Sequence, residues 1–244
     1  MKRSGWLFAV CALMACGDSA DDRALDAGWA PDAASIDASV AFGSISGDCS
    51  VLDDELTSSQ ASVFRSAFDF PRIYMSSDAP LVEEGTVRLL NTVNAGGSSV
   101  FSEAFSFEVL GRCESAALIA TETEISYDVD GKKTDFSTDI DSVRIGVSVT
   151  RAVNFPFDSP FTVSDAQTLL EGKLADILVS SANVSAGDAW QKQILAIMAY
   201  GPGHGDSLQT AVALVDSAVR ADTIVWIIVT DGDDGFIYCD GPCQ

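Results

Sequence analysis

The fold prediction starts from residues 133–151, KTDFSTDIDSVRIGVSVTR. In the second half of this stretch, apolar residues occupy every other position: Val143, Ile145, Val147 and Val149. A period of two is that of a β-strand whose two faces meet different surroundings. The first half alternates in the same way, and residues 119–127, IATETEISY, predict one more strand upstream. The sequence therefore predicts a three-strand meander with one apolar face and one polar face.

The predicted polar face of this meander carries acidic side chains. Alternation places Glu122, Glu124 and Asp135 on it, together with Ser148 and Thr150. Carboxylate oxygens are the ligands that Mg²⁺ prefers. Glu124 and Asp135 are therefore our candidate metal ligands, with Mg²⁺ as the candidate cofactor.

Other apolar periods predict the elements around the meander. Helical spacing predicts helices at 56–68, 82–93, 99–110, from a Ser164–Gln167 capping box onward, at 190–200 and at 208–219. Asp130-Gly131 predicts a hairpin turn. Residues 223–229, TIVWIIV, form a continuous apolar run, which is typical of a strand covered on both faces. Helices, a meander, helices and a buried strand together predict a mixed α/β fold.

The chain is strongly acidic. Its 14 basic and 36 acidic residues give a formal net charge of -22. Such a surface repels phosphate backbones and anionic membranes, so we expect no broad nucleic-acid binding. Divalent cations and basic partners suit this charge better.

The N-terminus predicts export and a lipid anchor. Lys2 and Arg3 precede an apolar run that is shorter than the ~20 residues of a membrane span. The run ends in Leu13-Met14-Ala15-Cys16, which resembles the lipobox of bacterial lipoproteins, whose cysteine is lipidated. The alternative is an ordinary signal peptide with a chance cysteine. Gly17 follows Cys16, where the inner-membrane retention signal has Asp, and by resemblance this favours the outer membrane of the cell envelope.

These features divide the chain into three parts. Residues 1–15 are the predicted signal peptide. Residues 16–48 are rich in Ala, Asp, Ser and Gly, a composition that buries too little apolar surface to fold, so they predict a disordered tether after the lipidated Cys16. Residues 49–244 are the predicted single α/β globular domain.

The cysteines that remain after export and lipidation predict disulfides. Of the 6 cysteines, Cys11 leaves with the leader and Cys16 takes the lipid, so four remain in an oxidising compartment. Four cysteines allow three pairings. We favour the pairs Cys239–Cys243 and Cys49–Cys113, with a thiolate metal site as the alternative.

Two other polar segments are interpreted as loops. Residues 230–235, TDGDDG, resemble the end of a strand in von Willebrand A-type domains, but the Asp-x-Ser-x-Ser motif of those domains is absent. His204, the single histidine, stands in GPGHG without zinc-ligand spacing.

About half of the chain, from Ser102 to Val229, resembles an uncharacterised family known mainly from fungi, oomycetes and other protists. The matching pieces include Ser102-Glu103, Ser106-Phe107-Glu108, 121–125, Thr134-Asp135-Phe136, the GVSVTRA stretch 146–152, Asp165-Ala166, Leu169-Leu170, Trp190 and 192–195. GVSVTRA is the most specific of them. The resemblance implies no activity.

The predicted order of helix, meander, helix and strand is also similar to the core of restriction-endonuclease-like (PD-(D/E)XK) nucleases. That similarity implies Glu103 or Glu108 as the helix acid and Asp135 as the strand acid, which would hold Mg²⁺. Ser148 and Thr150 stand where the Glu and Lys of these nucleases belong, and Glu124 and Lys133 are the candidate substitutes.

Two functions therefore stay open. The favoured one is a non-catalytic domain that binds a protein or a small ligand. The alternative is a metal-dependent phosphodiesterase or nuclease-like hydrolase with a degenerate site built from Glu103, Glu108, Glu124 and Asp135. In that site Arg151, at the end of the third strand, would neutralise an acid or hold a substrate anion.

Overall fold

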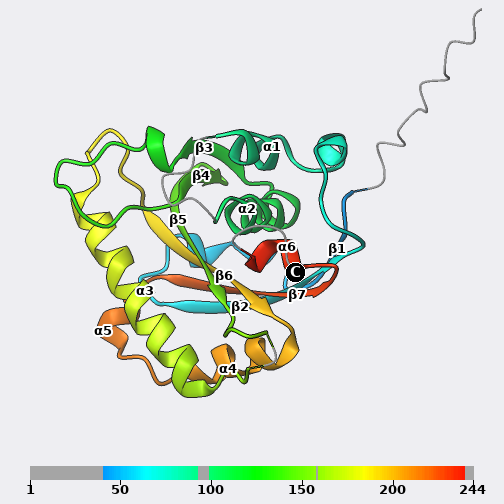
Figure 1. Cartoon of the computed structure of the whole chain (residues 1–244). Coiled ribbons are helices and arrows are strands. Elements are labelled where there is room, and N and C mark those ends of the chain that lie inside the picture. Colours follow the sequence, from blue (N-terminus) through cyan, green and yellow to red (C-terminus); the bar gives the residue numbers. More distant parts are fainter. Residues whose placement is uncertain (1–40, 93–98, 158, 240–244) are drawn as a thin grey trace, which may run out of the picture. The chain divides into compact units, whose positions relative to one another are not determined.

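A seven-stranded mixed sheet runs through the part of the chain that the structure describes. The structure is a computed structural model, and it describes residues 41–92, 99–157 and 159–239. The strand order is β1-β2-β7-β6-β5-β4-β3 (Figure 1). The strands are β1 (Ser44–Gly47), β2 (Ser62–Phe70), β3 (Ala117–Thr121), β4 (Phe136–Ile140), β5 (Val143–Ala152), β6 (Lys192–Tyr200) and β7 (Ile224–Gly232). The four central strands, β2, β7, β6 and β5, are parallel, whereas antiparallel pairs form both edges.

Helices cover both faces of this sheet (Figure 1). One face carries α1 (Glu84–Asn91), α2 (Val100–Glu114) and α6 (Gly235–Tyr238). The other carries α3 (Val163–Asn183), α4 (Pro202–Val212) and α5 (Ser217–Arg220). Three short 3₁₀ turns complete the elements of the described residues: η1 (Asp54–Leu56), η2 (Ser76–Leu81) and η3 (Glu122–Glu124). The mixed α/β prediction is confirmed, and none of the described helices has the length and apolar character needed to cross a membrane.

The predicted meander is present as β3, β4 and β5. In the β4–β5 ladder Phe136 lies opposite Val147, and both pack into the core on the α2 face. The opposite face of β5 was expected to be open and polar, but it is covered. Gly146 lies under Trp190, Ser148 is 9% exposed, and Ala152 belongs to the core between the sheet and α3. Since β5 pairs in parallel with β6 inside the sheet, both of its faces are buried.

Two predicted helices are strands. Residues 56–68 were predicted as a helix, but most of that stretch belongs to β2, and the helix predicted at 190–200 is β6. β6 is a parallel strand buried on both faces, so apolar residues face both ways and the period of two is lost. β2 keeps its alternation, with Phe64, Phe68 and Phe70 on the face of the α2 core, and the helical interpretation overlooked it. The strand predicted at 223–229 is confirmed as β7, whose first seven residues are buried.

Three predicted boundaries also differ. The cap of α3 is a box between Thr162 and Asp165, two residues before the predicted one. The helix predicted at 208–219 is divided into α4 and α5. Asp130-Gly131 lies in a longer connection between β3 and β4 instead of forming a tight hairpin.

The folded part begins before the predicted boundary at residue 49. Strand β1 pairs with β2, and the Phe42 side chain is 2% exposed among Phe70, Tyr74 and Phe105. The last residues of the predicted tether therefore belong to the fold. The predicted signal peptide and Cys16 lie outside the described residues.

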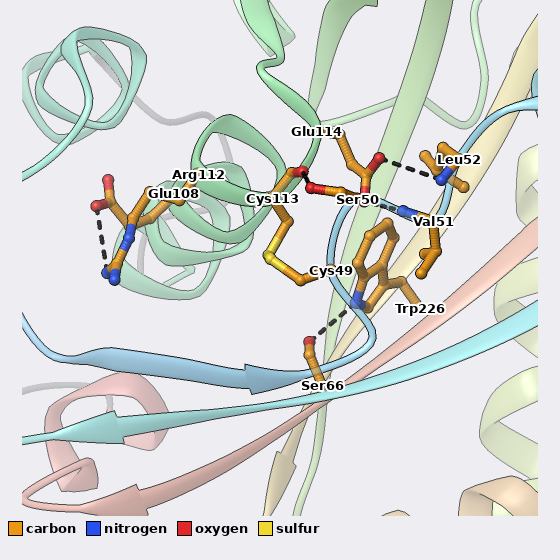
Figure 2. Close-up of a disulfide and its surroundings, with 10 residues drawn as sticks. All are labelled: Cys49, Ser50, Val51, Leu52, Ser66, Glu108, Arg112, Cys113, Glu114 and Trp226. Carbon is orange, nitrogen blue, oxygen red and sulfur yellow. Dashed lines mark hydrogen bonds and ion pairs between the residues drawn. A yellow bond between two sulfur atoms is a disulfide. The ribbon is translucent and has the colours of Figure 1, made fainter.

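A disulfide fastens this N-terminal segment to α2 (Figure 2). It joins Cys49 to Cys113, which is the pairing favoured from the sequence. Beside it, the Ser50 hydroxyl donates to the Cys113 carbonyl at 2.9 Å. Cys239 is also disulfide-bonded, and its favoured partner Cys243 lies outside the described residues.

Two glycines provide a matched test of the packing on β5. A Cβ on Gly146 would lie 2.6 Å from ring carbons of Trp190, so Gly146→Ala should lower the free energy of unfolding by about 1–3 kcal/mol through overpacking. A Cβ on Gly172 in α3 would meet nothing within 4 Å, so Gly172→Ala should raise it by up to about 1 kcal/mol. Urea denaturation of both variants checks this, and equal effects of the two substitutions would contradict it.

Candidate functional site

Glu103 and Asp135 are the predicted acids that the structure brings together. Glu103 lies in the first turn of α2, is 5% exposed, and accepts a hydrogen bond of 2.5 Å from the Ser99 hydroxyl. Asp135 directly precedes β4, where its carboxylate accepts the Val149 amide proton at 2.6 Å. Because the β4–β5 ladder ends at Phe136 and Val147, this side chain satisfies the next backbone N–H on the flank of β5 that β4 leaves unpaired.

The environment of Asp135 favours its protonated form. Burial raises the pKa of its carboxyl to about 7, and the negative charges of Glu103 and Glu122 add to the increase. The hydrogen bond from Val149 and the positive charge of Lys173 act in the opposite direction. A carboxyl that titrates near neutrality beside a second carboxyl can accept and release protons, which is the arrangement that general acid–base chemistry uses.

Glu108 faces a different part of the molecule. It is fully buried and accepts hydrogen bonds from the Glu83 backbone N–H at 2.8 Å and the Thr86 hydroxyl at 2.7 Å. Burial raises the pKa of this carboxyl, and the hydrogen bonds from Thr86 and Glu83 counteract the increase. Glu83 is the residue before α1, so the hydrogen bond from its backbone N–H to Glu108 fixes the N-terminus of that helix against α2. The role of Glu108 is therefore structural.

Glu124 is not on a strand face as predicted, because β3 ends at Thr121 and the chain turns into η3. Its carboxylate closes a capping box by accepting the Thr121 amide proton at 2.8 Å, and it pairs with Arg88 of α1 at 2.5 Å. The hydrogen bond from the Thr121 backbone is the largest cause that lowers the pKa of Glu124. Its strongest contacts thus tie η3 to α1.

Arg151 lies on the same face of β5 as Val147 and Val149, as alternation predicts. Its guanidinium donates to the carbonyls of Ile237 at 3.4 Å and Tyr238 at 3.3 Å, so it helps to hold α6 against the end of the sheet. Ser148 and Thr150 point to the opposite face, toward α3. The helix acids and the polar positions of β5 therefore lie on different sides of the sheet.

The predicted site is thus divided among separate places. Across 41–92, 99–157 and 159–239, no group of three or more His, Cys, Asp or Glu side chains is arranged to hold a metal ion. Glu124 and Asp135, the predicted ligand pair, have separate partners. Of the nuclease-like constellation, the pair of Glu103 and Asp135 remains.

The two other polar segments also have structural partners. Asp233 follows β7 and accepts the Ile73 amide proton at 3.2 Å. His204 lies in the first turn of α4 instead of a loop, and its ring stacks on Phe161 with a centroid distance of 5.1 Å. Burial lowers the pKa of this imidazole.

Lys173 was not among the predicted site residues. It directly precedes Leu174 on α3, and only the fold brings its charge near Asp135. The sequence shows only that Lys173 lies next to the apolar stripe of this helix, and many lysines without a functional role have the same position.

Comparison with known proteins identifies a partial relative. The chain is 40% identical over 153 residues to a Dictyostelium discoideum protein described as "AAC-rich mRNA clone AAC4 protein". The match covers 60% of this chain and 22% of that protein's length, so the chain spans about a fifth of its relative. No family model and no solved structure matches.

The raised pKa of Asp135 predicts a pH effect on stability. The folded state keeps a proton on this carboxyl at pH values where the unfolded chain, with the ordinary value of 3.8, has released it. This contribution to stability is complete below 3.8 and is lost as the pH rises through about 7. Asp135→Asn removes the titration and keeps an acceptor for Val149. Its free energy of unfolding should therefore rise relative to the wild type between about pH 4 and about pH 8.

Urea denaturation across this pH range measures the difference between the two proteins. The exposed Asp54→Asn variant is the control, and it should follow the wild type. Parallel pH profiles of Asp135→Asn and the wild type would contradict the prediction.

Proposed function

We propose that this chain is an exported, lipid-anchored lipoprotein whose folded domain binds a partner without catalysing a reaction. One observation carries the second half of the proposal. Two of the acids that the sequence assigns to one hydrolase site have separate structural partners. Glu108 accepts hydrogen bonds from residues at the start of α1, and Glu124 caps η3 and forms a salt bridge with Arg88 of α1. A hydrolytic metal centre needs several such ligands at one point.

The anchor rests on the sequence alone. Lys2, Arg3, the short apolar run and Leu13-Met14-Ala15-Cys16 have the order of a lipoprotein leader. The Ala-, Asp- and Ser-rich segment that follows would separate the domain from the membrane. The proposed place is the cell envelope, with the outer membrane favoured.

A second candidate function is supported by the pair of Glu103 and Asp135. Asp135, with a pKa of about 7, interacts with the negative charge of Glu103 from α2 and with the positive charge of Lys173 from α3, which supplies an acid, a base and a cation around one carboxyl. With Mg²⁺ held by the two acids, this group would suit the hydrolysis of a phosphodiester. The connectivity α2-β3-β4-β5-α3-β6 is the order that the nuclease-like interpretation requires.

Replacing Cys16 tests the anchor. In the expected outcome, Cys16→Ser moves the protein from the membrane fraction to the soluble fraction and abolishes the incorporation of labelled fatty acid. Cys11→Ser is the matched control, because that cysteine is expected to leave with the leader. Fatty-acid labelling that persists in Cys16→Ser would rule out the proposed lipidation site.

A cleavage assay separates the two candidate functions. The purified domain is incubated with a fluorogenic nucleic acid and with a phosphodiester dye, in Mg²⁺ or Mn²⁺. We expect no turnover above that of the heat-treated protein. Metal-dependent turnover that disappears in Asp135→Ala and persists in Asp54→Asn would establish the hydrolase and overturn the binding domain.

A further inference from the structure

A groove lies between α1 and the edge of the sheet, and neither Glu103 nor Asp135 lines it. Its volume is about 330 Å³. One wall is the first turn of α1, with Glu83, Glu84 and Gly85, and the opposite wall is the start of β3 with Ala117 and Leu118.

The groove has apolar side chains and a tightly packed base. Ala117 and Leu118 supply its accessible apolar surface, and the ring of Phe107 from α2, which is 1% exposed, supports them from below. A Cβ on Gly85 would lie 2.2 Å from Phe107 Cε1, so only a glycine lets α1 approach the ring this closely. The backbone of Glu83 is held by its hydrogen bond to the buried Glu108. The groove is therefore formed before any ligand arrives, which reduces the ordering cost of binding.

The charge of the groove selects a cation. Glu83 and Glu84 are exposed at its rim, and within the described ranges neither carboxylate is in an ion pair. The positive charge of Arg88 is balanced by Glu124 at 2.5 Å. Two negative charges with no ion pair among the described residues thus lie beside the apolar side chains of β3, on a chain whose net charge is -22. A long side chain with an apolar stem and a cationic head matches both parts.

The sheet edge beside the groove is closed to strand pairing. β3 is the last strand of the sheet, and an unpaired edge would accept a further strand. Arg88 donates to the outward carbonyl of Ile119 at 3.2 Å, and the β3–β4 register shifts between Leu118 and Ala120. A ligand is therefore recognised through a side chain in the groove, and not through its backbone.

We propose that the groove between α1 and β3 binds a basic peptide segment, with the stem of one lysine or arginine side chain lying against Ala117 and Leu118 and its head group between Glu83 and Glu84. This inference rests on the proposed binding function and assigns its ligand class. The acidic surface steers such a segment toward the domain, and the groove supplies the specific contact.

Fluorescence anisotropy with the full chain tests this assignment. The probe is a fluorescein-labelled peptide of alternating lysine and glycine, compared with peptides in which glutamate or leucine replaces lysine. We expect the lysine peptide to bind and the other two to bind more weakly. Glu83→Gln with Glu84→Gln should weaken binding of the lysine peptide about fivefold, as the loss of two exposed ion pairs predicts.

The matched control removes the same charge elsewhere. Asp54→Asn with Glu171→Gln changes two acids outside the groove, and it should alter the affinity less than about twofold. Ala117→Trp fills the groove from an exposed position and should abolish the specific binding. An equal loss in the control pair, unchanged binding in Ala117→Trp, or failure of the lysine peptide to bind would each overturn the assignment.

The assignment and the proposed function fail differently. If the peptide does not bind and no metal-dependent cleavage occurs, the groove loses its ligand and the non-catalytic proposal stands. If cleavage occurs and depends on Asp135, the non-catalytic proposal falls whatever the peptide does.

Discussion

The structure depends on the burial of helix α2 on all its sides. Residues Ser102 to Leu110 are buried without interruption, and with them the carboxyl groups of Glu103 and Glu108. Burying a carboxylate is costly unless hydrogen-bond donors surround it. Glu103 accepts a hydrogen bond from the N-cap residue Ser99, whereas the other two acids of this helix have donors from distant segments. Glu114, for example, accepts the backbone N–H groups of Val51 and Leu52 at 3.1 Å each. These donors determine where the N-terminal segment and α1 must lie.

This constraint explains why acidic residues in the sequence are a poor guide to a catalytic site here. In the sequence, structural carboxylates look the same as metal ligands. Glu108 accepts a hydrogen bond from the residue before α1, and Glu124 closes a capping box. The partner of Glu108 is 25 positions away in the sequence. Glu124 has one partner 3 positions away and a salt bridge to Arg88 of α1. Asp135 differs from them, because its carboxyl lies near Glu103 and titrates near neutrality.

The sequence predicts those elements whose two faces meet different surroundings, or whose apolar run is continuous. The alternation in 143–149 predicts β5, and the run at 223–229 predicts β7. β6 was missed because a short buried strand and one side of a buried helix have similar patterns. β2 was missed although its phenylalanines alternate, because the predicted helix began at Leu56, outside the strand. The sequence predicted which residues could form the candidate site, but it did not predict where their side chains lie. Glu103 and Asp135 do lie near each other, but the contribution of Lys173 and the turn that removes Glu124 depend on tertiary packing.

The disulfide has a mechanical consequence. It spans a sequence separation of 64 residues and joins a segment at the sheet edge to the end of the most deeply buried helix. A pull on the chain upstream of Phe42 would first detach the short strand β1 from β2. Beyond that point the tension would pass through Cys49 directly into Cys113, and the chain between them would be spared. The force needed to extend the domain from its N-terminus would then depend on the force needed to pull α2 out of the core.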